Sequence, residues 1–382
     1  KRVAPRARAA PARRRQPRRW RRSAAARMAA ASGKPRADVV RRFEVPDAEV
    51  VCCHAFSKDE SLLAVAPNTE DVLIFRLTGA EFQSTHVLSR HTQRVTGLSW
   101  SCDGRLVSCS EDRTAYVWEW SEAAGNWRAV LVELRAPRAA LCVQWSPDGK
   151  RFAVGLSSKD VAVCYYEGTV GCWVALKIGR SIHQAAVGAL AWHPTSQYLA
   201  VGSFDRRCLV YDVTEENMLP SQQPPFGEAQ VSEEASAWVN AVAFSPKGRF
   251  LAFAAQDATV SLKDLKDGPG AEVCRIRWRQ LPFLRLAFVG ESQLVACGFD
   301  CTPVLLRQAG GRWAVAAALE CTGASPAAPP AGVDGNAFDQ ARKAFGGRAA
   351  AAPGGGAGAC HTGVITGCAS LGAPGRFSTS AL

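Results

Sequence analysis

Four aspartates occupy the same place in a repeated segment of this sequence, and they are the first candidates for chemistry: Asp112, Asp205, Asp257 and Asp300. A carboxylate can act as a general acid or base when its pKa is suitably shifted. An active site, however, occurs once, whereas these side chains recur with the repeat. We therefore interpret them as turn acids that hydrogen-bond to backbone amides and to a nearby His or Ser.

The second repeat contains the most complete set of polar partners for such an acid. His91, Ser108, Asp112 and Trp118 are spaced so that they could form one buried hydrogen-bonded chain. We recognise no His at the matching place in the other repeats, so we expect only a partial network there. These residues are predicted to be structural.

The remaining reactive side chains form no catalytic or metal-binding pattern. The six His show no metal-ligand spacing, and no phosphate-binding Gly-rich loop, H-E-x-x-H, G-x-S-x-G or calcium loop occurs. Cys360 and His361 are adjacent, and adjacent side chains seldom form a nucleophile–base pair. The 14 Cys include no C-x-x-C pair and suit small core residues in a reducing compartment. We predict a protein that is not an enzyme and that needs no cofactor or metal.

The elements that carry these residues follow a repeat of forty-odd residues. An apolar run ends in an aromatic residue, a turn follows, and a second apolar run comes next. The turns S-P-D-G (146–149) and S-P-K-G (245–248) suit tight hairpins. The aromatic anchors are Phe56, Trp100, Trp145, Trp192, Phe244 and Phe288.

This period is typical of four-stranded propeller blades. A third strand often begins just after the recurring Asp, and a weaker fourth strand follows. A degraded seventh unit lies at 364–380. The sequence therefore predicts an all-β fold, a seven-bladed WD-repeat β-propeller whose last blade is incomplete.

The basic charge of the chain is confined to one segment. The formal net charge is +12, yet residues 1–27 hold one Lys, eleven Arg and no acid, which leaves 34 basic against 34 acidic residues. This Arg-, Ala- and Pro-rich tail could be a transit peptide, a nuclear or RNA-binding arm, or sequence upstream of a start at Met28. We favour the last, and we expect nucleic-acid binding only if the tail is genuine.

No apolar stretch approaches the ~18 residues of a membrane-spanning helix, so we expect no membrane span.

Several sequence segments are more specific than the turn residues that propellers have in common. CHAFSKD with LAVAPN (54–68), EDRTAYVW (111–118), RAPRAALCVQW to VAVCYYE (135–167), PFGE (225–228) and LPFLRLAF to CGFDCTPVLL (281–306) are the distinctive ones. With these residues the chain resembles the family of WD-repeat subunit 1 of the actin-related protein 2/3 complex. The resemblance covers roughly residues 45–320 and resumes at 361.

A long insertion separates the sixth and seventh units. Its Gly-, Ala- and Pro-rich flanks surround GNAFDQARKAFGGR, and a short helix is predicted at 336–345. Phe338, Arg342 and Phe345 fall on one face of that helix. The two Phe could fold back on the propeller, or the loop could be disordered. The resemblance implies instead that the insertion projects and that these three residues contact actin.

The seventh unit ends before the acid-Gly turn and the Trp-Asp strand that a blade of this class carries. Such propellers close by pairing an N-terminal strand, here 39–45, with the last blade. We therefore expect the natural protein to continue for about a dozen residues or more. The expected parts are a basic tail (1–37), blades one to six with the closing strand (38–320), the insertion (321–360) and a partial seventh blade (361–382).

The resemblance implies a non-catalytic scaffold in the cytoplasmic actin cytoskeleton that supports filament nucleation and branching. Its implied partners are the other subunits of the complex, actin filaments and the acidic tails of nucleation-promoting factors. Acidic tails need basic surface, and the candidates are Arg135/Arg138, Arg206/Arg207 and Arg275/Arg277/Arg279. The alternative is another WD-repeat adaptor, nuclear or RNA-associated through the Arg-rich tail.

Overall fold

The structure is a computed structural model, and its described part is almost entirely β-strand. It describes residues 36–38, 45, 48, 50–79, 81–178, 182–215, 226–268, 271–322, 361, 364–371 and 375–381. One short 3-10 helix, η2, spans Leu265–Asp267. Within these residues, no helix is long and apolar enough to cross a membrane.

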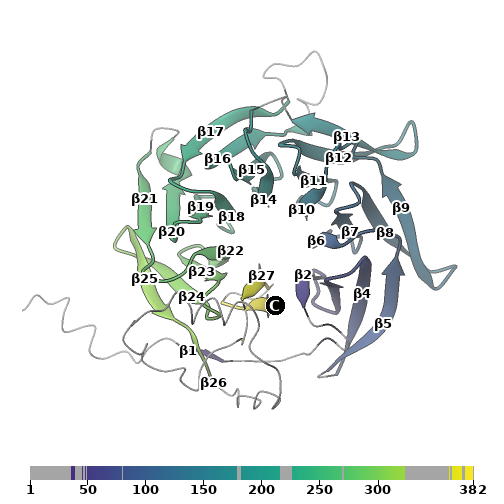
Figure 1. Cartoon of the computed structure of the whole chain (residues 1–382), viewed down its shortest axis with the longest axis horizontal. Coiled ribbons are helices and arrows are strands. Elements are labelled where there is room, and N and C mark those ends of the chain that lie inside the picture. Colours follow the sequence, from purple (N-terminus) through teal and green to yellow (C-terminus); the bar gives the residue numbers. More distant parts are fainter. Residues whose placement is uncertain are drawn as a thin grey trace, which may run out of the picture. The chain divides into compact units, whose positions relative to one another are not determined.

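Six four-stranded antiparallel sheets and one two-stranded sheet form a ring, with strands paired in chain order (Figure 1). Blade one contains β2 (Val51–Phe56), β3 (Leu62–Pro67), β4 (Asp71–Thr78) and β5 (Glu81–Ser89). Blade two contains β6 (Val95–Trp100), β7 (Leu106–Ser110), β8 (Ala115–Ser121) and β9 (Asn126–Val132). Blade three contains β10 (Ala140–Trp145), β11 (Arg151–Leu156), β12 (Val161–Glu167) and β13 (Cys172–Ile178).

The other half of the ring repeats this plan. Blade four contains β14 (Val187–Trp192), β15 (Tyr198–Ser203), β16 (Arg207–Asp212) and β17 (Glu228–Glu234). Blade five contains β18 (Val239–Phe244), β19 (Phe250–Ala255), β20 (Thr259–Asp264) and β21 (Val273–Arg277). Blade six contains β22 (Phe283–Gly290), β23 (Gln293–Gly298), β24 (Val304–Ala309) and β25 (Arg312–Ala318). Blade seven has β27 (Ile365–Ser370) and β28 (Phe377–Ala381) in the described residues.

The prediction of an all-β WD-repeat propeller is confirmed, and in the described residues blade seven contributes β27 and β28. The first strand of every blade has a β-bulge at the same position, from Val51/Cys53 in blade one to Ile365/Gly367 in blade seven. A bulge bends and twists a strand locally. The shared bulge shows that blade seven starts as the other six do.

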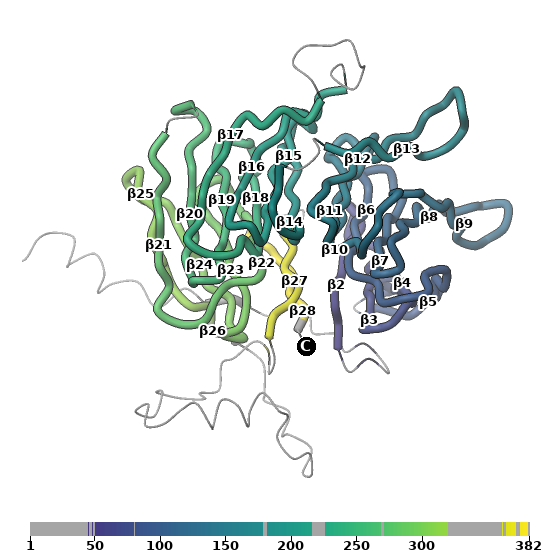
Figure 2. Tube along the Cα trace, turned by 45° about the horizontal axis from the view of Figure 1, so that its top comes forward, coloured from purple at the N-terminus to yellow at the C-terminus, as the bar shows by residue number. Residues whose placement is uncertain are grey.

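The predicted hairpin turns owe their shape to Ser and Gly. In blade three, Ser146 Oγ donates to the Arg151 carbonyl at 2.7 Å and accepts from the Arg151 amide at 3.1 Å. Gly149 and Gly248 have φ of +72° and +74°, which a glycine adopts without strain. On the outer side of the ring, the hairpins β8–β9 and β12–β13 project beyond their neighbours (Figure 2).

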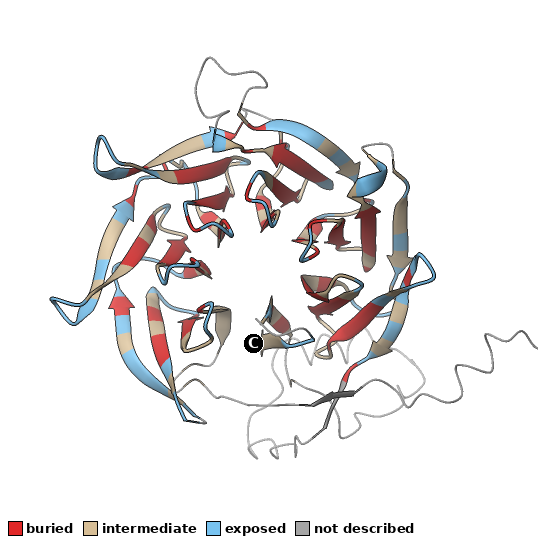
Figure 3. Cartoon of the chain, turned by 180° about the vertical axis from the view of Figure 1, so that it is seen from behind, coloured by how far each residue is buried: buried red, intermediate tan, exposed pale blue. Residues whose placement is uncertain are grey.

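The apolar cores lie between neighbouring blades. Buried residues concentrate in the inner three strands of each blade, whereas the outer strands are more exposed (Figure 3). Consecutive blades from one to seven share six apolar clusters, one for each junction. Short blades bury their faces against each other in this way, so each blade depends on its neighbours.

The junction of blade seven with blade one, which we call the seam, is different. In the described part of the chain, no apolar cluster is shared across it, and the cluster nearest to it stays within blade one and Val45. Polar contacts hold the seam instead. His54 Nδ1 and Nε2 each lie 2.9 Å from the hydroxyls of Ser380 and Ser378. Thr366 Oγ1 donates to the Val51 carbonyl at 2.9 Å.

Two expected elements fall largely outside the described residues. Of the expected closing strand (39–45) the structure describes Val45 alone, and the insertion helix (336–345) is not described. The structure does describe β1 (Arg36–Asp38) paired in parallel with β26 (Glu320–Thr322). The closing strand, the insertion helix and the domain boundaries therefore stay predictions.

Candidate protein-interaction surface

The polar chain of blade two joins the loop before β6, strand β7, the turn after β7 and strand β8. His91 Nδ1 lies 2.9 Å from Asp112 Oδ2, and His91 Nε2 lies 2.8 Å from Ser108 Oγ. The indole of Trp118 donates to Ser108 Oγ at 2.9 Å. Burial raises the pKa of Asp112, but hydrogen bonds from Thr114 and from backbone amides outweigh it, so the net pKa is lowered. Burial lowers the pKa of His91 despite the adjacent carboxylate.

Blade four contains an equivalent His, so the expectation that the other blades lack one is wrong there. His183 Nδ1 lies 3.1 Å from Asp205 Oδ2, and its Nε2 lies 3.0 Å from the Tyr211 hydroxyl. His183 precedes Asp205 by almost the same interval as His91 precedes Asp112. That interval was the signal in the sequence. Tyr211 takes the place of the Trp, because its hydroxyl reaches the ring directly.

Blades five and six fill the His position with other donors. The Ser236 hydroxyl donates to Asp257 in blade five. In blade six the Trp278 indole donates to Asp300 Oδ2 at 2.7 Å. The four aspartates thus accept hydrogen bonds from four different sets of partners at one structural position. Such a repeated arrangement anchors turns and makes no unique reactive centre. Over the described ranges, no group of three His, Cys, Asp or Glu is placed to hold a metal ion.

These turns lie on one face of the ring, which we call the upper face. Each turn between the second and third strands is bonded to the loop that enters the same blade. Examples are Glu111 N to Arg94 O at 3.0 Å and Ser157 N to Ala139 O at 2.9 Å. The upper face therefore consists of turns and inter-blade loops, and binding residues lie disproportionately on loops that a rigid scaffold positions.

The three basic patches expected from the sequence all involve this face. Arg135, Arg138, Arg206 and Arg207 are exposed. Arg206 lies 3.6 Å from the exposed Glu234, an ion pair worth little in water.

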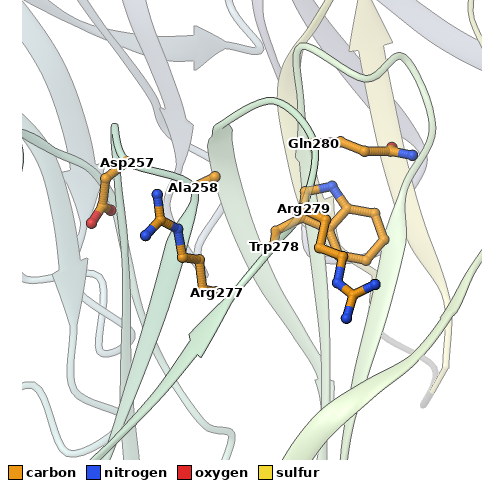
Figure 4. Close-up of a pocket in the computed structure, with 6 residues that line it drawn as sticks. All are labelled: Asp257, Ala258, Arg277, Trp278, Arg279 and Gln280. Carbon is orange, nitrogen blue, oxygen red and sulfur yellow. The ribbon is translucent and has the colours of Figure 1, made fainter. Parts of the chain in front are cut away.

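The third patch adjoins a cavity of about 400 Å³, lined by Asp257, Ala258, Arg277, Trp278, Arg279 and Gln280. Figure 4 shows Arg277 reaching toward Asp257 and Ala258, with Arg279 on the other side of Trp278. Trp278 is fixed by its bond to Asp300 and packs against Phe283, with ring centroids 5.9 Å apart. Neither Arg277 nor Arg279 has an ion pair with a described residue. The site therefore combines an apolar wall with two available cations.

Comparison with known proteins agrees with this architecture. The family model "WD domain, G-beta repeat" matches residues 82–119, 178–212 and 229–264. Actin-related protein 2/3 complex subunit 1A-B of Xenopus laevis is 36% identical over 268 residues, which are 67% of this chain and 71% of that protein. Subunit 1A of Arabidopsis thaliana is 35% identical, over 68% and 70%. Subunit 1 of Schizosaccharomyces pombe is 32% identical, over 68% and 71%.

This chain belongs to the family of actin-related protein 2/3 complex subunit 1. The resemblance found in the sequence is thereby confirmed. Two of the matched WD repeats run from the outer strand of one blade to the third strand of the next, since 82–119 spans β5 to β8 and 229–264 spans β17 to β20. A repeat of this family therefore ties two blades together covalently as well as through the shared core.

Phe338, Arg342 and Phe345, which were predicted on an insertion helix, lie outside the described residues. Sequence reasoning missed the cavity beside Trp278. Blade five has the small Ala258 at the turn position where blades two to four carry Arg113, Lys159 and Arg206. Trp278 occupies the position that a His holds in blades two and four. Both Ala258 and Trp278 line the cavity. Neither feature follows from the local sequence, because each depends on which turn positions are equivalent between blades.

Proposed function

We propose that this chain is a non-catalytic scaffold subunit of the actin-related protein 2/3 complex in the cytoplasmic actin cytoskeleton. It would support filament nucleation and branching through contacts with the other subunits. Membership of the subunit 1 family carries this proposal. The six inter-blade cores support it, because they make the ring a stiff platform.

Affinity purification of the full-length chain tests the assignment. We expect actin-related proteins and the other subunits to co-purify in a stable complex. Recovery of nuclear or RNA-binding proteins without actin-related proteins would refute the proposal and favour the adaptor alternative.

We further propose that acidic tails of nucleation-promoting factors dock at Arg275, Arg277 and Arg279. Of the three basic patches, this one adjoins a cavity, and Trp278 supplies an apolar wall there. An acidic segment could then place carboxylates near the guanidinium groups and one side chain in the cavity.

The test is binding of a fluorescent acidic tail peptide to the complex. Arg277→Glu with Arg279→Glu should weaken binding by about tenfold or more, since each charge contact contributes roughly 1 kcal/mol. The matched control is Lys58→Glu with Lys247→Glu, which makes the same charge change in turns between first and second strands. Equal affinity for both double variants would exclude this site.

The insertion is proposed to contact actin through Phe338, Arg342 and Phe345. This proposal rests on the family resemblance and on the shared helical face in the sequence. Phe338→Ala with Phe345→Ala should reduce branching while the complex still assembles. Unchanged branching would show that these residues do not contact the filament productively.

A further inference from the structure

In blades two and four, the turn on the upper face buries its acidic side chain and exposes its basic one. The carboxylates of Asp112 and Asp205 are buried against His91 and His183, with side chains only 6% and 3% exposed. The next residue in each turn is an exposed cation, Arg113 in blade two and Arg206 in blade four. The acid is therefore covered by protein, whereas the cation faces water and can contact a partner.

Blade three has a cation at the same place, but its turn acid, Asp160, follows the cation and lies 3.7 Å from Lys177 Nζ. Ser158 takes the position of the aspartate, and the exposed Lys159 follows. The backbone at Arg113, Lys159 and Arg206 has φ of +71°, +75° and +73°. A non-glycine residue seldom adopts this conformation, and its cost tends to be tolerated where the side chain has a use.

The turn itself does not require a positive charge. Ala258 in blade five and Cys301 in blade six have the same backbone conformation, with φ of +63° and +58°. The cations are thus confined to three consecutive blades. A cation at this turn position is therefore a feature of one sector of the ring and is not required by the repeat.

Neighbouring loops extend this sector. Arg90, Arg135, Arg138 and Arg207 are exposed and make no ion pair with a described residue. We name the following set the basic arc: Arg90, Arg113, Arg135, Arg138, Lys159, Arg206 and Arg207. Near it, Glu133 and Glu234 are exposed acids, and two more carboxylates, Glu111 and Asp160, are paired with cations outside the arc. The basic arc is therefore net positive.

A large apolar side chain stands at one end of the basic arc. Trp238 is 57% exposed, and its ring lies 5.7 Å from that of Phe204, in the same turn as Arg206. Further along the upper face, Leu281 is 48% exposed. Trp beside Arg is characteristic of surfaces that sit at the interface of a membrane with water.

We propose that the upper face of blades two to four docks on an anionic membrane, with the basic arc against the lipid headgroups and Trp238 at the interface. Seven cations spread over three blades match a charged surface better than a single phosphate group. The cavity suited to one side chain lies elsewhere, beside Arg277. This proposal is independent of the acidic-tail site.

Vesicle co-sedimentation tests the proposal with phosphatidylcholine vesicles that contain or lack phosphatidylserine. Every sample is the full-length chain with the basic residues of 1–27 replaced by Gln, so that the tail contributes no charge. The test variant is Arg113→Glu, Lys159→Glu and Arg206→Glu together. The control is Lys58→Glu, Lys150→Glu and Lys247→Glu, exposed cations of equal number in turns between first and second strands.

We expect the parent chain to bind only the anionic vesicles, and more weakly at high salt. Each cation near such a surface contributes about fivefold in affinity, so the loss of three cations should cost about 100-fold, and repulsion of the three added carboxylates should increase the loss further. The control should stay within about threefold of the parent, since distant charges are screened. Trp238→Ala should weaken binding several-fold without removing the preference for anionic lipid.

Three results would overturn the proposal. The parent chain could fail to bind anionic vesicles, or the two triple variants could lose affinity equally. Alternatively, the test variant could keep its vesicle binding and lose affinity for polyglutamate, which would assign the basic arc to an acidic peptide. An unchanged urea midpoint in both variants ensures that the comparison concerns folded protein.

Discussion

His54 should make the stability of the ring depend on pH through the seam. Burial, together with the nearby charges of Arg285 and His361, lowers the pKa of His54 to about 4. In the unfolded chain a His titrates near 6.5. The unfolded state therefore takes up the proton first as the pH falls, and folding loses stability between about pH 6.5 and pH 4. The full difference corresponds to about 3 kcal/mol.

The variant His54→Ala isolates this effect. At pH 7.5 it should cost about 2–4 kcal/mol, because Ser378 and Ser380 lose their partner and a space opens in the seam. At pH 4 the wild type has already lost most of that advantage. The difference between the two proteins should then shrink to about 1 kcal/mol or less.

Urea unfolding of both chains from pH 7.5 to pH 4 measures this difference, and titrating groups that do not interact with His54 cancel in the subtraction. His193→Ala is the matched control, since His193 bridges to the Gly248 carbonyl of the next blade at a junction that also has an apolar cluster. We expect a smaller effect there. A difference for His54→Ala that is independent of pH would refute the low pKa and the role given to the seam.

Three further substitutions test the packing of the ring. Gly248→Ala should destabilise the chain by about 2 kcal/mol or more in thermal unfolding, because φ is +74° and a Cβ would lie 1.9 Å from His193 Nε2. Lys263→Met should cost about 3–5 kcal/mol in urea, since it leaves a carboxylate of β17 without the cation that lies 2.6 Å away. A stable Lys263→Met chain would show that water reaches this pair. Asp112→Asn should cost about 1–3 kcal/mol, with a smaller loss at low pH where the wild-type carboxylate is protonated; a loss that is constant with pH would contradict its lowered pKa.

The sequence predicted the blades well because their determinants are local. Each blade is specified by signals within about twenty residues: an aromatic anchor such as Trp100 or Trp145, a Ser–Gly turn and an alternating apolar run. Because these signals recur in every repeat, one blade with a weak signal does not obscure the pattern. The recurring Asp was also placed correctly in its turn. These features need no knowledge of which blade faces which.

The hydrogen-bond and ion-pair partners in the fold were harder to predict from the sequence, because they depend on contacts between elements that are distant in the chain. His183 was missed because its second partner is a Tyr and not the Ser and Trp of blade two. Lys263 is 1% exposed and is paired with Glu233 of the neighbouring blade, a contact that no local pattern indicates. The polar contacts of the seam could not be predicted from the sequence for a similar reason, since His54 and Ser380 are 326 residues apart.

The shared cores of the ring have a consequence for how the molecule can be divided. A cut in the projecting loop between β12 and β13 leaves Val161 and Val163 on one piece and Ile178 with blade four on the other, so it parts the walls of the cluster between blades three and four. The two pieces then carry complementary faces of that core and the two halves of the β12–β13 ladder, so they have reason to find one another in solution. A cut between blades also parts one cluster but leaves no such ladder to restore, and each piece would expose an apolar face that favours aggregation over reassembly.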